Sequence, residues 1–216
     1  MKTHIYFIPG TAANSKIFER IDLPKDQYEM HFLDWIIPTS KNEKIEDYAL
    51  RMSKKIEHKN PVLIGVSFGG IVAQEISKIV PCEKIIIISS IKTKHELSKR
   101  LRIVRFFRLY KLFPSKSIDK IENLLRKIYK EKAEKRIKIY QNYLSVRNPL
   151  YLNWAIKQAL FWSQKEELPN IQHIHGDNDP IFPIRYIKNC IKVSGGTHIM
   201  IVTKAKKISQ IILSLF

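Results

Sequence analysis

Short apolar runs alternate with longer segments of helical pattern along most of the chain. The apolar runs have the length and the β-branched composition of buried strands, and turn residues bound each of them. They cover Ile5–Ile8, Glu29–Leu33, Val62–Val66, Ile85–Ile88, Ile171–Ile174 and Cys190–Val193. The intervening segments predict helices at Asn14–Ile21, Glu43–His58, Gly70–Ile79, just after Pro183, and at Ile199–Leu215. This alternation indicates an α/β fold with a doubly wound, mostly parallel six-stranded sheet.

The charge of the chain is concentrated in one segment. The 216 residues carry a formal net charge of +18, and residues 92–166 hold 20 Lys or Arg against 6 Asp or Glu. No Pro/Gly/Ser-rich linker separates this segment from the rest. We therefore expect a core made of residues 1–91 and 167–216, with residues 92–166 (the insertion) forming a basic helical subdomain on it. Its helices are predicted near His95–Phe113, Ile118–Val146 and Pro149–Ser163.

Cysteine content and hydropathy bear on the cellular compartment. Two cysteines, Cys82 and Cys190, are too few for a disulfide framework, which favours a reducing compartment. The apolar run Ile5–Ile8 stops at Pro9 and is too short for a signal peptide. No apolar run reaches the length needed to span a bilayer. The sequence thus favours a soluble, cytoplasmic protein.

A Gly-x-Ser-x-Gly motif, Gly65–Gly69, stands between a predicted strand and a predicted helix. At such a turn the serine, here Ser67, takes a strained conformation that raises its hydroxyl above the sheet. A glycine two residues away on each side avoids a clash of Cβ atoms. The following helix directs free N–H groups toward the site, where they favour an oxyanion. The motif predicts a nucleophilic serine.

A serine nucleophile needs a base and an acid, and both follow later in the chain. His198 lies after the sixth predicted strand, and Asp179 lies in the loop after the fifth. The carboxyl ends of parallel strands are where such sheets place their sites. Asp177, in the same loop, is the rival for the acid, but the spacing from Gly176 favours Asp179, and the alternative role for Asp177 is to cap the turn.

Together these motifs resemble those of the α/β-hydrolase superfamily, over about the whole of the core. The resemblance rests on Gly65–Gly70, on Gly176-x-x-Asp179-x-x-x-Pro183, and on Gly196-Thr197-His198. It implies Ser67 as nucleophile, His198 as general base and then acid, and Asp179 as the residue that orients the imidazole. It also implies an oxyanion hole formed by the backbone N–H of Phe68 and by that of Thr11 or Ala12. From the resemblance we expect a core without the family's usual two leading strands, with the insertion at the position of the family's lid.

This combination predicts a serine hydrolase that cleaves a small-molecule carboxylic ester or thioester through an acyl-enzyme on Ser67, with no cofactor. The fold alone does not fix the reaction, so C–C bond hydrolysis, acyl transfer, lyase chemistry and a non-catalytic binding role stay open. We expect no metal site. His173 and His175 only half-match a His-x-His-x-Asp-His signature, because Asn178 replaces its last ligand.

The insertion admits two interpretations. Its basic, amphipathic pattern is typical of a surface that meets an anionic substrate or an anionic membrane. Alternatively, its apolar side covers the active site and its charges are simply solvated. Nucleic acid is disfavoured as a partner, since no groove-reading motif is present. Five large side chains are candidates for an apolar acyl pocket: Phe106, Phe107, Trp154, Phe161 and Trp162.

Overall fold

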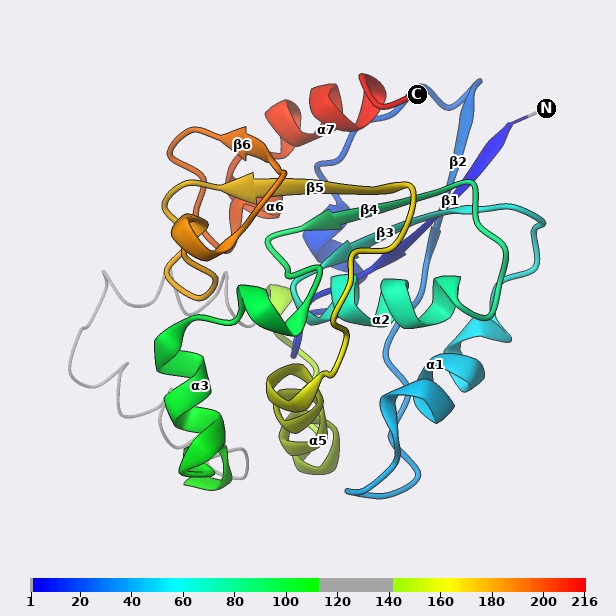
Figure 1. The fold of residues 1–216 in the computed structure, drawn as a ribbon. Coiled ribbons are helices and arrows are strands. Elements are labelled where there is room, and N and C mark those ends of the chain that lie inside the picture. The colour runs from blue at the N-terminus through cyan, green and yellow to red at the C-terminus, as the bar shows by residue number, and fades with distance from the viewer. Residues whose placement is uncertain (1, 113–141) are drawn as a thin grey trace.

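A six-stranded sheet forms the centre of the molecule (Figure 1). The computed structural model describes residues 2–112 and 142–216. The strands are β1 (Thr3–Ile8), β2 (Tyr28–Phe32), β3 (Val62–Val66), β4 (Lys84–Ile88), β5 (Ile171–Gly176) and β6 (Ile191–Val193). They follow the order β2-β1-β3-β4-β5-β6, and every neighbouring pair is parallel. The predicted fold class and its six strands are confirmed.

Helices cover both faces of this sheet. The α-helices are α1 (Ile45–Ser53), α2 (Phe68–Ser77), α3 (Lys99–Phe106), α5 (Pro149–Phe161), α6 (Met200–Thr203) and α7 (Ala205–Leu213). Single 3-10 turns are η1 (Ser15–Phe18), η2 (Lys94–Glu96), η3 (Leu109–Leu112) and η4 (Ile184–Tyr186). In Figure 1, α1 and α2 lie on one side of the sheet and α7 on the other, as a doubly wound fold requires.

The alternation of side chains along the strands explains the two layers. On β1, Tyr6 and Ile8 pack into the cluster that holds α1, α2 and α5. Ile5 and Phe7 point to the opposite face and pack with η1, α6 and α7. Successive residues of a strand face opposite sides, so a run such as Ile85–Ile88 must be apolar throughout to serve both cores.

Three predicted helices differ in detail from those observed, and a fourth cannot be compared. The predicted helix His95–Phe113 is divided into η2, α3 and η3. The segment 14–21 forms only the turn η1, where the Asn14 side chain accepts the Lys16 N–H. The last helix is broken at Lys204, whose φ of −130° leaves the helical range, so that α6 and α7 are separate. The expected helix 118–146 falls almost entirely outside the described residues.

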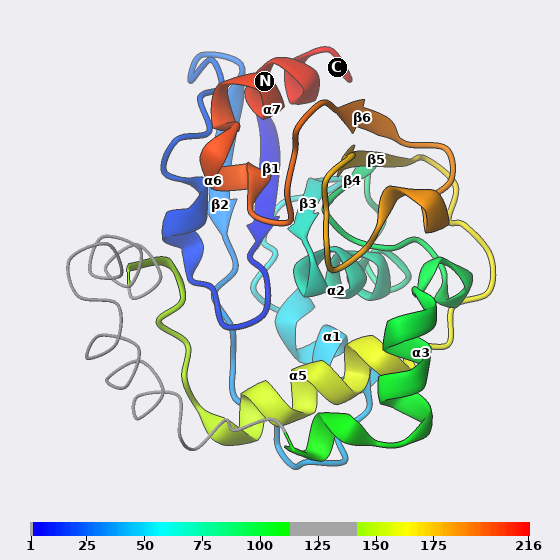
Figure 2. The same ribbon diagram turned by 90° about the vertical axis from the view of Figure 1, so that its left-hand side faces the viewer.

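Within the insertion, α3 contacts α5, and α5 contacts α2 (Figure 2). The Asn148 side chain caps α5 at the Tyr151 N–H, and Pro149 occupies its first position, where no N–H is needed. The Ser98 hydroxyl caps α3 at Leu101. The helix α5 buries Trp154, whose indole N–H donates to the Glu43 carbonyl at 2.8 Å. This contact ties the insertion to the core.

Among the helices of residues 2–112 and 142–216, none combines the length and the apolar character that crossing a membrane requires.

Candidate active site

Ser67 occupies a sharp turn between β3 and α2. Its φ of 53° and ψ of −120° lie outside the regions that L-residues favour. A Cβ on Gly65 would collide with the carbonyl of Gly69, and one on Gly69 would collide with the carbonyls of Ile8 and Pro9. Both glycines are therefore sterically required, as the motif predicts. The turn places the serine at the N-terminus of α2.

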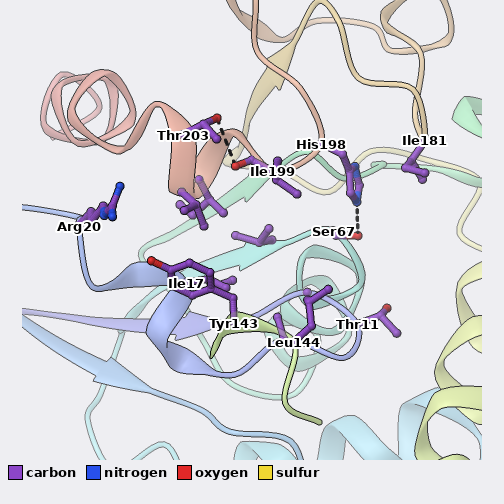
Figure 3. A pocket seen from close by; sticks show the side chains of 15 residues that line it. Thr11, Ile17, Arg20, Ser67, Tyr143, Leu144, Ile181, His198, Ile199 and Thr203 are labelled. Carbon is purple, nitrogen blue, oxygen red and sulfur yellow. Dashed lines mark hydrogen bonds between the residues drawn. The ribbon is translucent and has the colours of Figure 1, made fainter. Parts of the chain in front are cut away.

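The structure brings Ser67, His198 and Asp179 into one hydrogen-bonded chain. His198 Nε2 lies 3.0 Å from Ser67 Oγ, and His198 Nδ1 lies 2.8 Å from Asp179 Oδ2. Figure 3 shows the imidazole directed at the serine hydroxyl. Because Nδ1 faces a carboxylate, it carries the proton, which leaves Nε2 as the acceptor for the serine proton. Both contacts have the length of normal hydrogen bonds.

The carboxylate of Asp179 is fully buried and fixed from two sides. Its Oδ1 accepts the backbone N–H groups of Ile181 (2.8 Å) and Phe182 (2.9 Å), and Oδ2 is left for His198. The loops that carry Asp179 and His198 meet where Gly176 and Gly196 touch, with no room for a Cβ on either. Asp177, the rival candidate, is exposed.

Two further buried histidines of β5 lie near Asp179: His175 is next to its carboxylate, and His173 contacts His175. His175 Nε2 donates to the Phe182 carbonyl at 2.7 Å and lies 3.7 Å from Asp179 Oδ2. Burial lowers the pKa of His175, outweighing the opposite effects of the Phe182 carbonyl and of Asp179. His175 is therefore a neutral neighbour of the carboxylate. His173 Nε2 lies 3.1 Å from His175 Nδ1, so these two buried rings bond to each other.

The loop after β1 approaches Ser67 from the other side. A Cβ on Gly10 would lie 3.5 Å from the Ser67 Cβ. Thr11 lines the pocket around Ser67, whereas Ala12 packs into the core on the α1–α2 face. Of the two candidate oxyanion donors, Thr11 thus lies beside the nucleophile. The N-terminus of α2, beginning at Phe68, supplies further N–H groups and adjoins this loop, because a Cβ on Gly69 would collide with the Ile8 and Pro9 carbonyls.

A largely apolar cavity of about 670 Å³ opens at Ser67 and His198. It extends from these two side chains toward Arg20 (Figure 3). Its apolar lining comes from the region of η1, the end of β3, the segment after residue 141, the loop after β5 and the region of α6: Ala13, Ile17, Val66, Tyr143, Leu144, Ile181, Ile199, Ile201 and Val202. The cavity can accept an apolar chain beside the nucleophile.

The expected acyl-pocket aromatics do not line this cavity. Trp154 and Trp162 are buried in the core, where Trp162 Nε1 donates to Glu75 Oε1 at 2.7 Å. Phe106, Phe107 and Phe161 are exposed. That expectation was wrong because the indole N–H groups find partners under α5, while the end of α3 faces solvent.

Comparisons with known proteins concern the fold. No protein-family model and no curated protein matches the sequence. Among solved structures, an epoxide hydrolase from Bacillus megaterium has a TM-score of 0.74 at 14% identity, covering 100% of this chain and 93% of its own. An enol-lactonase from Burkholderia xenovorans has a TM-score of 0.73 at 11% identity, and the match covers 100% of this chain and 91% of the enol-lactonase. The RedJ thioesterase of prodiginine biosynthesis in Streptomyces coelicolor has a TM-score of 0.64 at 13% identity, and the match covers 99% of this chain and 85% of the thioesterase.

Proposed function

The chain has the α/β-hydrolase fold, and on that premise we propose that it is a serine hydrolase acting on a carboxylic ester or thioester. The observation that carries the proposal is the continuous chain from Ser67 Oγ through His198 to the buried Asp179. A strained serine, an imidazole of defined tautomer and an oriented carboxylate are the components of nucleophilic acyl transfer.

The reaction begins with attack of Ser67 Oγ on the substrate carbonyl. His198 Nε2, 3.0 Å away, takes the hydroxyl proton, and Asp179 stabilises the imidazolium that forms. The carbonyl oxygen becomes an oxyanion, which accepts the N–H groups of Phe68 and Thr11. When this intermediate collapses, the imidazolium protonates the leaving alcohol or thiol. An ester between Ser67 and the acyl group remains.

Water completes the cycle. His198 Nε2 takes a proton from a water molecule, whose oxygen attacks the acyl carbon, and the second oxyanion occupies the same hole. Its collapse returns the proton from His198 to Ser67 Oγ and releases the acid. We assign the apolar cavity to the acyl chain, because its lining of aliphatic side chains begins at Ser67 and His198.

The names of the solved structures describe several reactions on this fold, including lactone, thioester and epoxide cleavage. We favour ester or thioester cleavage because a serine hydroxyl forms a hydrolysable acyl ester. We also propose a reducing, cytoplasmic compartment, in which the two cysteines, Cys82 and Cys190, stay unpaired as they are here.

Covalent labelling tests the nucleophile. We expect a fluorophosphonate to add one adduct to the full chain, mapped by mass spectrometry to the peptide with Ser67. Ser67→Ala removes the adduct, whereas Ser90→Ala, a change at a buried serine that bonds to the Ser67 carbonyl, retains it. No adduct on the wild type, or an adduct that survives Ser67→Ala, contradicts the proposal. A panel of esters and thioesters of graded acyl length then identifies the substrate class.

The exposed surface formed by the end of α3 and by η3 favours a second role. Phe106 is 79% and Leu112 77% exposed, and Ile103, Phe107 and Leu109 are also exposed. Basic side chains surround them: Lys99, Arg100, Arg102, Arg105, Arg108 and Lys111. Apolar side chains can enter the lipid interface. Each Lys or Arg near an anionic membrane surface contributes about 1 kcal/mol of attraction to the headgroups. We propose that this surface contacts an anionic membrane.

Vesicle sedimentation tests this contact. We expect the chain to sediment with vesicles of phosphatidylcholine mixed with phosphatidylserine, less so at high salt, and not with phosphatidylcholine alone. The double change Phe106→Ser and Phe107→Ser weakens binding, and Leu50→Ser, a change at an exposed leucine of α1, does not. Equal binding to both kinds of vesicle, or no loss in the double variant, refutes the membrane role.

A further inference from the structure

Three histidines far apart in the sequence meet away from the triad. One ring nitrogen from each of His4, His31 and His58 lies within 4.8 Å of the corresponding nitrogens of the other two. All three side chains are partly buried. His4 lies near the start of β1, and His58 lies before β3. Ser67 follows the carboxyl end of β3, so the cluster is separate from the proposed active site.

The strand register explains why these residues converge. In the parallel pair β1–β2, His4 stands opposite Glu29 and Tyr6 stands opposite His31. Residues two apart share a face of a sheet, so all four point to the face covered by α1 and α2, where Tyr6 packs. His58 reaches them from the loop after α1.

A tyrosine anchors the third histidine. The Tyr6 hydroxyl lies 2.7 Å from His58 Nδ1 and accepts the Glu57 N–H at 3.1 Å. A hydrogen bond at one ring nitrogen fixes which nitrogen is left to bind a metal, and metal-bound histidines almost always have such a partner. Tyr6 therefore leaves Nε2 of His58 as the ligand atom.

The separation between the His4 and His31 nitrogens is close to that between two ligands of one metal ion. His4 Nδ1 and His31 Nε2 share a hydrogen bond of 3.1 Å, and an ion would replace its proton. Two nitrogens on a tetrahedral Zn²⁺ are about 3.4 Å apart, given Zn–N bonds of about 2.0–2.1 Å. The Glu29 carboxylate lies 3.7 Å from His4 Nδ1 and 4.0 Å from His31 Nε2. It is placed to supply a fourth, oxygen ligand.

One side chain has to turn before all three nitrogens bind. The rings of His4 and His58 are stacked, with centroids 3.5 Å apart and planes 13° from parallel. Because an imidazole binds a metal in its own plane, two stacked rings do not direct their lone pairs at one point. His58 belongs to a loop rather than to a strand, so its backbone can move and tilt the ring while Nδ1 keeps its bond to the Tyr6 hydroxyl.

We propose that His4, His31 and His58, with Glu29, bind a divalent transition-metal ion of the Zn²⁺ class. Imidazole and carboxylate donors suit Zn²⁺, Co²⁺ and Ni²⁺ and disfavour Ca²⁺ and Mg²⁺, which prefer oxygen ligands. The ion joins the edge strand β2 to β1 and to the loop before β3. An ion that binds only the folded chain stabilises it by mass action. No local motif marks this site, because its three histidines come from three different segments.

Calorimetric titration of the untagged, EDTA-treated full chain with Zn²⁺ tests the site. We expect one ion per chain, and a melting temperature that rises with Zn²⁺ and not with Mg²⁺. His58→Ala, in the loop, and His31→Gln weaken binding by at least about 100-fold. His95→Ala, at an exposed histidine outside the cluster, and His198→Ala, in the triad, bind Zn²⁺ as the wild type does.

Co²⁺ gives an independent readout, since its visible absorption bands intensify in a tetrahedral site. These bands should appear on the wild type and be lost in His58→Ala. Absence of saturable binding, or unchanged binding in His58→Ala, overturns the proposal. Loss of binding in His198→Ala instead assigns the ion to the triad and likewise overturns it. None of these measurements requires hydrolase activity.

Discussion

The indole Nε1–H of Trp35 donates a 3.0 Å hydrogen bond to the carbonyl oxygen of Gly10. In a trans peptide the C=O and the next N–H point in opposite directions, so this bond also sets the direction of the Thr11 N–H. The Ala13 N–H donates to the same carbonyl at 3.0 Å. Trp35 is thus a positioning residue for the proposed oxyanion donor at Thr11, and no sequence motif marks it.

Trp35→Phe removes this bond and keeps an aromatic ring against Phe68 and Tyr151. We expect kcat to fall by about tenfold with KM changed less than about twofold, because an oxyanion donor acts mainly in the transition state. Steady-state kinetics on one ester measures this split. Trp162→Phe, which removes a buried indole bond to Glu75 under α5, should leave kcat unchanged. A rise in KM alone would refute the positioning role.

Asp179→Asn should lower kcat by about 10³-fold or more, since an amide no longer enforces the imidazole tautomer that accepts the Ser67 proton. The matched control is Asp177→Asn in the same loop, at an exposed carboxylate. It should retain near wild-type turnover. Kinetics on the same ester, with circular dichroism to verify folding, decides between the two acids. Equal losses in both variants would remove Asp179 from its proposed role.

Val202→Trp should shorten the preferred acyl chain. Val202 lines the cavity at α6, and a bulkier side chain there takes space from the substrate. Each methylene buried is worth about 0.8 kcal/mol, or roughly fourfold in kcat/KM. Relative kcat/KM for octanoyl over acetyl esters should therefore fall, while that of Ile37→Trp, at an exposed position, stays unchanged. An unchanged ratio in Val202→Trp would place the acyl chain elsewhere.

The strands and the turn that carries Ser67 were predictable because both depend on local patterns. The run Ile85–Ile88 is apolar because both faces of β4 are covered, and the Gly65–Gly69 turn follows from steric contacts within a few residues. His198 and Asp179 could be placed because each follows a strand of the same sheet.

Other features depend on contacts that periodicity does not encode. The helical spacing of apolar residues continues on both sides of Lys204, so it predicted one helix. The backbone instead leaves the helical conformation at Lys204, and the separate helix α6 lines the cavity. Trp35 donates a hydrogen bond to the Gly10 carbonyl, and His175 donates one to the Phe182 carbonyl. No periodic pattern in the sequence predicts either bond. Only the strand register reveals that His4 and His31 are neighbours.

The buried histidines behind Asp179 predict how stability depends on pH. Burial, reinforced by His175 and Lys92, lowers the pKa of His173 well below its usual value of 6.5. The unfolded chain therefore binds a proton near pH 6.5 that the folded chain does not bind. Stability is complete above this pH and falls as the pH decreases below it, by up to about 1.4 kcal/mol per pH unit for one such group.

His173→Gln tests this linkage, because an amide still donates to His175 Nδ1 and does not titrate. Between pH 8 and about pH 5, urea unfolding in EDTA should show a smaller loss of free energy in this variant than in the wild type. His175 and His31, whose pKa values burial also lowers, keep some slope in both proteins. His95→Gln, at an exposed histidine, should keep the full wild-type slope. Identical slopes in wild type and His173→Gln would mean that His173 is protonated in the folded chain as readily as in the unfolded one.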